Sequence, residues 1–256
     1  MTTASTPVAN HTLEKGLDIL ALFDDERPCL SAQDIRRELH LSQSTLYRLL
    51  RSMKSKGWIE DDGNGAFRPG LRILSLARVV RRQLTMGQVA LPVMQELSRL
   101  SGETILLTVM SGPHAVCVER VDGPQTVRAT LERGAVLPLY AGASATVLLA
   151  YADEALQDAI LAGPLPRHTP HTVTDPTELR CLLQRIRKDG FAFSDGEVDL
   201  GVRAVAAPVL SHGRGLVAGL SLVAPAGRLP DADVPRFGAL IKQSAKQLSD
   251  VAELQA

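Results

Sequence analysis

Apolar and polar residues alternate with helical spacing in the first part of the chain. Five apolar positions between Leu13 and Phe23 predict a first helix, which the charged run that ends at Pro28 terminates. A second helix is predicted to begin at Ser31, because Asp34 follows three residues later as in a capping box, and to end near residue 39.

A third helix is predicted to begin at a second cap, Ser42. Its apolar positions fall on one side, and they are Leu46, Leu49, Leu50 and Met53. Two short helices joined by a turn of about three residues are typical of the helix-turn-helix, in which the first helix presents the second to the DNA major groove.

Two short β-like runs, WIED and AFRP, follow this helix and flank the turn DGNG. A turn rich in Asp, Gly and Asn between such runs predicts a hairpin. A hairpin directly after a helix-turn-helix is the wing of a winged helix. Two further helices are predicted over residues 70–84 and 87–100, and the domain boundary is placed in this helical linker.

The pattern changes beyond Gly102 to the short β-like runs TILLTVM, HAVCVERV and TVRATL, which predict an antiparallel meander. The later predicted elements are helices over residues 144–161, 177–188 and 231–254 and strands over residues 202–210 and 216–224. Helices that pack on an antiparallel sheet make an α+β domain.

The predicted organisation therefore has three parts. They are a winged helix-turn-helix domain over residues 9–70, a linker helix over residues 71–86 and an α+β domain over residues 87–256.

Charge is distributed unevenly between these parts. The chain has 28 Lys and Arg against 28 Asp and Glu, and this zero net charge argues against a histone-like protein that coats nucleic acid. From His11 to Arg82, however, thirteen basic residues stand against ten acidic ones, a net of +3, which leaves −3 for the remainder. The stretch from Leu41 to Gly57 has four basic residues and no acidic one. The N-terminal part is therefore the one expected to approach a polyanion.

The cysteines and the hydropathy of the chain indicate the cellular compartment of the protein. Cys29, Cys117 and Cys181 are far apart and form no C-x-x-C pair, so reduced, mostly buried thiols are expected. No apolar run approaches the roughly 18 to 20 residues of a membrane span, and the first residues lack the features of a signal peptide. We expect a cytoplasmic protein without a membrane partner.

Several motifs, taken in order along the chain, resemble those of the IclR family of bacterial transcriptional regulators. In the first part these are LEKGLDILALFD, LSQSTLYRLLRSMKSKGWIE and FRPGLRILSLA; in the second they are GETILL, VCVERVDG, LPLYAGASATVLLA, FSDGEVDLGVRAVAAPV and AGLSLVAPAGR. The resemblance implies a winged helix that binds double-stranded DNA, a linker helix and a GAF-like effector-binding domain, assembled as a homodimer or a dimer of dimers.

The chain departs from the family pattern at three places. His40 stands where the turn of the helix-turn-helix usually has Gly, and histidine is among the residues that tolerate φ > 0. Arg36 occupies a position that is usually small, where it either alters the packing of the two helices or extends toward phosphate. Ala145-Thr146 replaces a Gly-Lys pair of the effector loop, so no lysine is expected there.

The DNA-binding candidates lie mainly on the third helix. Gln43, Ser44, Thr45, Tyr47, Arg48 and Arg51 are the candidates for base or phosphate contacts, and Ser31, Ser42, Lys54 and Arg68 are the candidates for phosphate contacts. Arg48 is the residue expected to contact guanine through two hydrogen bonds. The alternative is an ordinary solvated helix, and Ser31 and Ser42 also have a sufficient role as helix caps.

The second domain carries a candidate effector pocket. Small residues stand just ahead of an apolar helix, so free N–H groups at Ala143 to Ala145 could receive a carboxylate, although a close-packed loop explains the same residues. By resemblance the pocket is lined by Ala129, Leu131, Leu137, Ala141, Gly142, Ala143, Ser144, Ser194, Asp195, Glu197, Val202, Ala204, Ser221 and Val223.

The polar members of this set are few. Ala204 and Val223 replace the Cys or Ser of some relatives, which favours an organic acid larger than two or three carbons, aromatic acids included. Asp195 and Glu197 are either ligand contacts or residues of a turn.

Two classes of function fit these observations. One is a ligand-controlled regulator that binds a pseudo-palindromic promoter site, and the other is an enzyme that processes a small acid and has an N-terminal interaction module. The sequence shows no nucleophile–base pair, and Pro170 disfavours a metal site at the H-x-x-H spacing of His168 and His171. The run GRGLVAG lies between two strand-like runs, which predicts a hairpin turn and not a phosphate loop. The regulator is therefore the leading hypothesis, and neither a cofactor nor a metal is expected.

Overall fold

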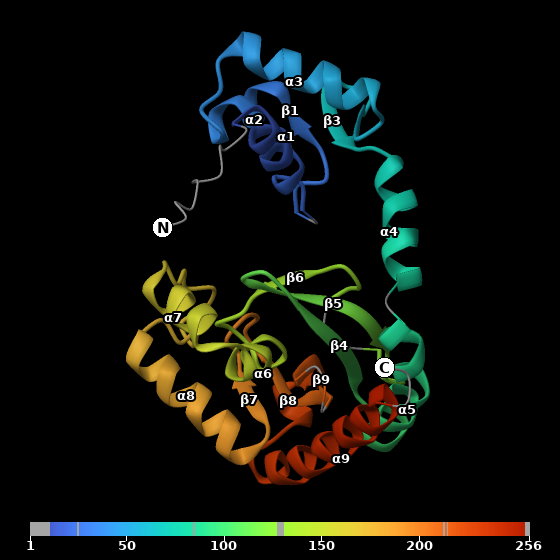
Figure 1. Ribbon diagram of the computed structural model, residues 1–256, viewed down its shortest axis with the longest axis vertical. Coiled ribbons are helices and arrows are strands. Elements are labelled where there is room, and N and C mark those ends of the chain that lie inside the picture. The colour runs from blue at the N-terminus through green and yellow to red at the C-terminus, as the bar shows by residue number, and fades with distance from the viewer. Residues whose placement is uncertain are drawn as a thin grey trace, which may run out of the picture. The chain divides into compact units, whose positions relative to one another are not determined.

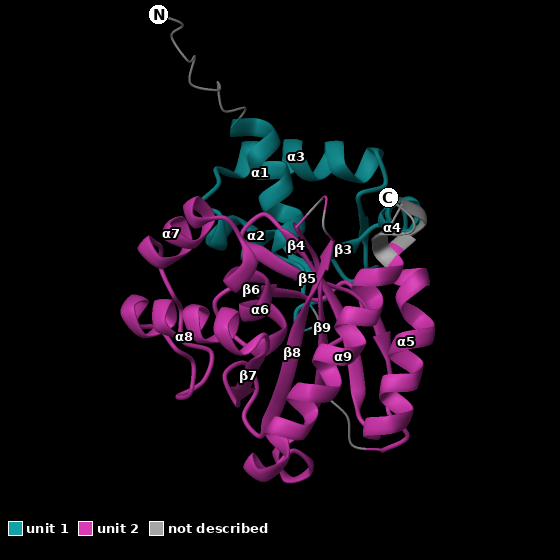
Figure 2. Cartoon of the chain, turned by 60° about the horizontal axis from the view of Figure 1, so that its bottom comes forward, with its two compact units in different colours: residues 1–83 teal, residues 84–256 magenta. Residues whose placement is uncertain are grey.

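The computed structural model describes residues 11–24, 26–83, 85–126, 131–211, 213 and 215–253. It divides the chain into two compact units, Met1–Gln83 and Leu84–Ala256, which are coloured separately in Figure 2.

The first unit contains four helices and a small sheet among its described residues (Figure 1). The helices are α1 (His11–Ala21), α2 (Ala32–Glu38), α3 (Gln43–Ser55) and α4 (Arg72–Gln83), and the strands are β1 (Leu30–Ser31), β2 (Ile59–Asp61) and β3 (Ala66–Pro69). The strands pair antiparallel in the order β1-β3-β2. The winged helix-turn-helix is confirmed, and β1 is a strand that the sequence pattern did not predict.

Local capping fixes where α2 and α3 begin. The Asp34 N–H donates to Ser31 Oγ at 3.1 Å, and the Thr45 N–H donates to Ser42 Oγ at 3.4 Å. Each serine thereby satisfies one of the N–H groups that a helix start leaves without an acceptor. Between the helices His40 has φ = 49°, and it is the described non-glycine residue with positive φ, as the sequence predicts.

The apolar face of α3 packs against α1 and α2. Leu46, Leu49, Leu50 and Met53 are all buried, and they contact Ile19 of α1 and Ile35 of α2 in one cluster. Burial of such side chains is worth about 1.5–3 kcal/mol each. Arg36 lies on the exposed side of α2, so it does not enter the helix packing.

The second unit is built on a six-stranded antiparallel sheet in the order β6-β5-β4-β9-β8-β7. The strands are β4 (Thr104–Ser111), β5 (His114–Val121), β6 (Val136–Pro138), β7 (Ala192–Asp195), β8 (Val202–Ser211) and β9 (Gly215–Pro225). The helices are α5 (Thr85–Ser101), α6 (Ala143–Tyr151), α7 (Glu154–Ala162), α8 (Pro176–Asp189) and α9 (Val234–Glu253), and short 3₁₀ turns, η1 (Ala226–Arg228) and η2 (Asp231–Asp233), precede α9.

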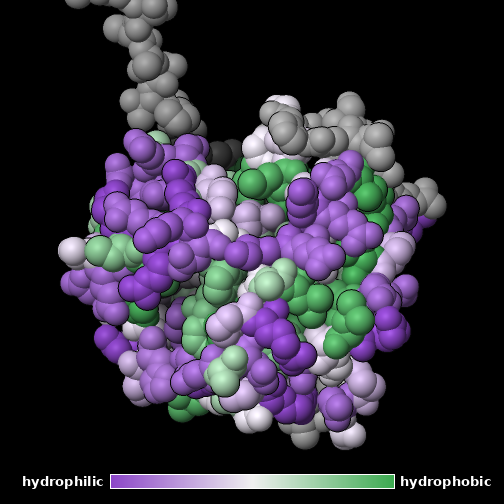
Figure 3. Space-filling view, turned by 90° about the horizontal axis from the view of Figure 1, so that it is seen from below, coloured by the Kyte–Doolittle hydropathy of each residue, from purple (hydrophilic) through white to green (hydrophobic). Residues whose placement is uncertain are grey.

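Both faces of this curled sheet are covered, as Figure 1 shows. Strand residues alternate between the faces, so Ile105 and Leu107 pack beneath α5 and α9 whereas Leu106 points to the side of α6, α7 and α8. The face seen from below in Figure 3 has hydrophobic areas interspersed with hydrophilic ones.

Helix α6 lies against the sheet with residues 143–150 all buried. Gly219 of β9 permits this approach, because a Cβ at that position would lie 2.9 Å from Thr108 Oγ1 and 3.0 Å from Val147 Cγ1. The Thr108 hydroxyl donates to the Ser144 carbonyl at 2.9 Å and ties α6 to β4. The helix therefore behaves as part of the core and not as an amphipathic surface helix.

Several predictions for the second unit were wrong. The single helix predicted over residues 144–161 is two helices, because Asp153 leaves helical geometry at ψ = 156° and caps α7 by accepting from the Leu156 N–H. Strands β6 and β7 were not predicted. The predicted strand over residues 126–131 falls largely outside the described residues.

The burial of the cysteine thiols and the hydropathy of the helices can also be compared with the predictions. Cys117 is buried, whereas Cys29 and Cys181 are exposed, so the prediction of mostly buried thiols was wrong. Burial raises the pKa of the Cys117 thiol to about 11. None of the helices within the described part of the chain has both the length and the apolar character that a membrane span requires.

Candidate functional site

The exposed side of α3 carries most of the predicted DNA contacts. Gln43, Ser44, Arg48 and Arg51 are exposed, and the Tyr47 ring is 49 % exposed. Thr45 is half-buried, and its hydroxyl oxygen accepts from the Ser42 hydroxyl at 2.9 Å. Among the described residues Arg48 and Arg51 have no ion-pair partner, so both guanidinium groups are available to an external anion.

The predicted phosphate contacts differ from these two arginines. The ammonium group of Lys54 forms an ion pair with Asp61 on β2, and Arg68 Nη2 lies 3.5 Å from Glu60 Oε2. The hydroxyls of Ser31 and Ser42 already act as caps. Contact with phosphate would therefore compete with an intramolecular partner at each of these four positions.

The wing holds its turn with the Asp62 carboxylate. Asp62 Oδ1 accepts from the Asn64 N–H at 2.8 Å and from the Ala66 N–H at 2.9 Å. Gly70 then allows the chain to pass close to the end of α3, since a Cβ there would lie 2.1 Å from the Gly57 carbonyl oxygen. The wing is thus fixed relative to α3 by backbone packing.

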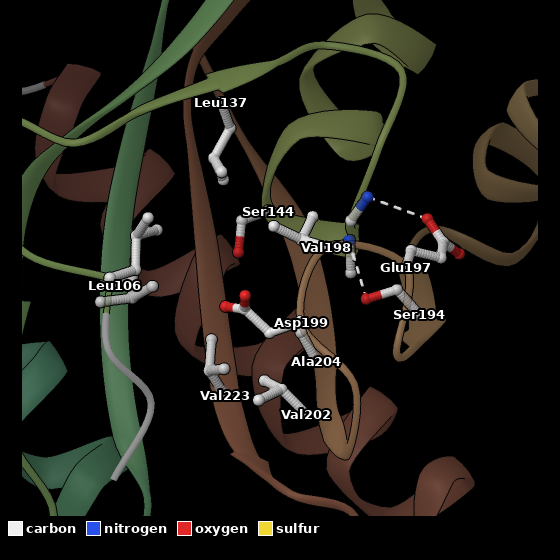
Figure 4. A pocket seen from close by; sticks show the side chains of 13 residues that line it. Leu106, Leu137, Ser144, Ser194, Glu197, Val198, Asp199, Val202, Ala204 and Val223 are labelled. Carbon is white, nitrogen blue, oxygen red and sulfur yellow. Dashed lines mark hydrogen bonds between the residues drawn. The ribbon is translucent and has the colours of Figure 1, made fainter. Parts of the chain in front are cut away.

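The second unit contains a pocket at the N-terminal end of α6 (Figure 4). It has about 480 Å³ of empty volume, with open solvent at its mouth included. Its described lining residues are Leu106, Leu131, Leu137, Gly142, Ala143, Ser144, Ser194, Glu197, Val198, Asp199, Val202, Ala204 and Val223.

Two side chains from another segment cap the buried start of α6. Gly142, at φ = 80°, donates its N–H to Glu197 Oε2 at 2.8 Å, and Ala143 donates its N–H to Ser194 Oγ at 3.0 Å. Figure 4 draws both hydrogen bonds. The Ala145 N–H donates to the Gly142 carbonyl at 3.0 Å.

These bonds correct the prediction that the amides of Ala143 to Ala145 are free. The structure assigns protein acceptors to two of them, and within the described residues only the Ser144 amide has none. The Ser144 hydroxyl donates to Ser221 Oγ at 2.8 Å. What remains for a ligand is therefore the Ser144 amide and the hydroxyl proton of Ser194, which accepts from Ala143.

Glu197 is the main buried titratable group of this pocket. Burial raises the pKa of its carboxyl above the ordinary value of 4.5, although the hydrogen bond from the Gly142 N–H favours the charged form. The proximity of Asp195 raises that pKa further.

Two threonine hydroxyls donate hydrogen bonds to the backbone of the segment that carries Glu197. The Thr169 hydroxyl donates to the Gly196 carbonyl at 2.5 Å, and the Thr172 hydroxyl donates to the Glu197 carbonyl at 2.7 Å. His171 Nδ1 lies 3.1 Å from the Asp195 carbonyl, and His168 Nε2 lies 3.1 Å from the Tyr140 hydroxyl. The two histidines therefore face different partners, and no metal-binding group of three His, Cys, Asp or Glu side chains occurs among the described residues.

Ten of the fourteen predicted pocket residues line the pocket, and three described ones do not. Ala141 and Ser221 are fully buried, and Ser221 lies behind Ser144 as its hydrogen-bond acceptor. The carboxylate of Asp195 accepts from Arg203 Nη2 at 2.6 Å, which holds its pKa below the ordinary value of 3.8. The fourteenth residue, Ala129, lies outside the described residues.

The sequence reasoning missed three lining residues, Leu106, Val198 and Asp199. Strand alternation through Ile105 and Leu107 could have placed Leu106 on the pocket side. Asp199 belongs to the same FSDGEVDLG segment as Glu197, and only the course of the loop between β7 and β8 brings its carboxylate into the pocket (Figure 4).

Comparison with known proteins covers nearly the whole chain. Residues 12–63 match the family model described as "IclR helix-turn-helix domain", and residues 79–250 match "Bacterial transcriptional regulator IclR C-terminal". The chain is 32 % identical over 240 residues to the HTH-type transcriptional regulator XynR of Escherichia coli, which covers 93 % of this chain and 95 % of XynR. It is 29 % identical to the HTH-type transcriptional repressor AllR of Escherichia coli, over 98 % of this chain and 94 % of AllR.

A solved structure adds a similarity in three dimensions. It is a crystal structure of an IclR homolog from Microbacterium hydrocarbonoxydans complexed with 4-hydroxybenzoate. It superimposes with a TM-score of 0.75 and is 30 % identical, and it covers 93 % of this chain and 98 % of that chain.

The capping role of Glu197 gives a testable pH dependence. A carboxyl with a raised pKa in the folded protein stabilises the fold below its unfolded pKa, and this contribution is lost as pH rises through the folded pKa. In Glu197→Gln the side-chain carbonyl can still accept from Gly142 and no charge is buried. The variant is expected to become more stable relative to the wild type as pH rises above 4.5, measured as the melting temperature between about pH 4 and pH 8.

Asp195→Asn is the matched control, two residues away. The pKa of Asp195 is lowered, so the stability from its bond with Arg203 is present above the ordinary pKa of 3.8 and lost only as pH falls below it. The stability difference between Asp195→Asn and the wild type is therefore expected to stay nearly constant between about pH 4 and pH 8. Identical pH profiles for Glu197→Gln and the wild type would contradict the buried-carboxyl assignment.

Proposed function

The chain belongs to the IclR family of bacterial transcriptional regulators, and we propose that it binds a pseudo-palindromic promoter site as a homodimer under the control of a small organic acid. Its DNA-binding regulatory role follows from the family, whose matched relatives are regulators and repressors and not enzymes. The palindromic site, the dimer and the acid effector are what we propose beyond that role.

The observation that carries the DNA-reading part is the pair of arginines on α3, Arg48 and Arg51, which have no ion-pair partner among the described residues. Arg48 and Arg51 are exposed one turn apart on the helix that a helix-turn-helix places in the major groove. Arg48 lies nearer the N-terminus of α3, which is the end that reaches base edges in this motif. A two-fold dimer meets two-fold DNA, so the site is proposed to have two similar half-sites.

The dimer is supported by the apolar stripe of α4. Ile73, Leu76 and Val80 lie at i, i+3 and i+7 on one side of the helix, and Leu76 and Val80 are 46 % and 51 % exposed. An isolated helix of about twelve residues is only marginally stable in water, so this stripe requires a cover. The same stripe of a second copy supplies one through coiled-coil-like packing.

The pocket supports control by a small molecule. Its walls are mainly apolar, its few polar groups converge at the start of α6, and a relative of similar fold has been crystallised with 4-hydroxybenzoate. The ligand carboxylate is proposed to accept from the Ser144 amide and the Ser194 hydroxyl. The raised pKa of Glu197 limits the repulsion between its carboxyl group and the ligand carboxylate, because the neutral form of the Glu197 carboxyl is more accessible. The ligand controls DNA binding only through its difference in affinity for the two arrangements of the dimer.

The first test addresses DNA reading. Arg48→Ala is expected to weaken binding to the promoter site by about 1–3 kcal/mol and to reduce discrimination at one base pair of each half-site. Lys54→Ala is expected to have a smaller effect because Lys54 already pairs with Asp61. Binding to the DNA upstream of the protein's own gene and to random DNA is measured at two salt concentrations. Arg180→Ala removes an exposed charge in the other unit as a control, and equal losses in all variants would contradict the proposal.

The second test addresses the dimer. Val80→Asp places a charge on the apolar stripe of α4 and is expected to shift sedimentation equilibrium toward monomer and to weaken DNA binding. Ser75→Asp places the same charge on the opposite, polar side of α4 and is expected to leave self-association unchanged. Unaltered self-association of Val80→Asp would exclude the α4 stripe as the dimer contact.

The third test addresses the pocket. At equal concentration, aromatic monocarboxylic acids are expected to raise the melting temperature more than acids of two or three carbons. An acid at a hundredfold excess over its Kd stabilises the folded protein by about 2.7 kcal/mol. Leu137→Ala is expected to weaken aromatic-acid binding about tenfold because it removes part of the apolar wall. Val136→Ala is the control on the same strand, since Val136 is 57 % exposed and does not line the pocket. Equal effects of the two variants would contradict the assignment.

A further inference from the structure

Two carboxylates line the same pocket, and they differ in what they already bind. Glu197 accepts from the Gly142 N–H, whereas Asp199 has no hydrogen-bond or ion-pair partner for its carboxylate within the described part of the chain. Its carboxylate points into the pocket (Figure 4). None of the described lining residues is cationic.

We propose that Asp199 determines which acids the pocket accepts: monocarboxylic acids that carry a hydroxyl group are bound, and dicarboxylic acids of the same skeleton are rejected. The inference rests on the proposed role of the pocket as the effector site. It adds the ligand class and the residue that selects it.

The backbone holds Asp199 in place at the pocket mouth. In the turn between β7 and β8 the Val202 N–H donates to the Asp199 carbonyl at 3.2 Å, and the Gly196 N–H donates to the Val202 carbonyl at 2.8 Å. Next to it the Ala226 N–H donates to the Gly201 carbonyl at 2.7 Å. Both ends of this turn are therefore held by backbone hydrogen bonds, and they place the exposed side chain of Asp199 at the pocket mouth.

In the same segment, the carboxylate of Asp195 already has a cationic partner. Asp195 is bound by Arg203, which also contacts Asp231 at 2.8 Å. Asp199 lacks such a cation and faces the apolar side chains of Leu106, Val202 and Val223 across the pocket. A ligand hydroxyl satisfies an ionised carboxylate by donating one charge-assisted hydrogen bond.

The distribution of donors and acceptors sets the orientation of the ligand. The available donors, the Ser144 amide and the Ser194 hydroxyl, lie at the start of α6, and this end receives the ligand's carboxylate. The other polar end of the ligand then meets Asp199. A second carboxylate at that end faces a like charge, which disfavours the ionised form of both groups.

The experiment uses matched ligands on two skeletons and the full-length protein. One set is benzoate with its three hydroxybenzoates and three benzenedicarboxylates, and the other is hexanoate, 6-hydroxyhexanoate and adipate. Binding is measured by calorimetry for the wild type, Asp199→Asn, Asp199→Lys and the control Glu178→Gln, which removes an exposed negative charge at the start of α8. Folding is checked by circular dichroism and DNA binding.

In the wild type, at least one hydroxy acid is expected to bind about tenfold or more tightly than its parent acid, and its dicarboxylate is expected to bind more weakly than the parent. Asp199→Asn is expected to reduce both differences, and Asp199→Lys to reverse the preference in favour of the dicarboxylate. Glu178→Gln is expected to match the wild type.

The outcomes separate this inference from the proposal on which it rests. If the acids bind but hydroxylation gives no advantage, or if Asp199→Asn keeps the wild-type selectivity, the inference is overturned and the pocket remains an acid site. If no acid binds while DNA binding is intact, both the acid-effector proposal and the inference are overturned.

Discussion

The organisation of the second unit depends on one constraint, which is that α6 begins inside the protein. A helix start leaves amides without intrahelical acceptors, and water satisfies them only where the helix end is exposed. Residues 143–150 are all buried, so the acceptors come from the segment that follows α8. Glu197 binds the Gly142 amide and Ser194 binds the Ala143 amide. The bonds that stabilise the buried helix start are therefore the bonds that form one wall of the pocket.

The two functional surfaces use the same backbone feature in opposite environments. At α3 the local cap Ser42 satisfies the helix start, and the neighbouring side chains remain exposed toward solvent. At α6 the cap comes from distant residues, and the first residues of the helix are buried beside a mainly apolar pocket. An exposed helix start suits a large, hydrated polyanion, whereas a buried one suits a small ligand that replaces water inside a pocket. Burial, and not the helix start itself, separates these two uses.

The sequence predicted the parts of the fold that local signals determine. The caps Ser31 and Ser42, the buried face of α3, the wing and the positive φ of His40 all follow from residue types at short spacing. The break at Asp153 is also local, but its capping signal lies within a long apolar pattern that hides it.

The pocket was predicted less completely, because its polar groups depend on contacts between distant segments. Asp195 and Glu197 are equivalent in the sequence, yet Asp195 turns to Arg203 on its neighbouring strand while Glu197 turns to Gly142. Asp199 reaches the pocket only through the turn at Gly196 and Gly201, two glycines with positive φ. No spacing rule assigns these directions before the sheet register is known.

Charge pairing on the first unit bears on how selectively it reads DNA. Phosphate contacts supply most of the sequence-independent affinity, which grows with the number of free cations. Here Lys54 pairs with Asp61 and Arg68 lies near Glu60, both acids on β2, so the wing offsets part of the positive charge beside α3. Arg48 and Arg51 keep their charge unpaired among the described residues. On the proposed placement of α3 in the major groove, this arrangement lowers affinity for any DNA while it leaves Arg48 and Arg51 free for base edges. A regulator that must find one site among many benefits from that ratio more than from raw affinity.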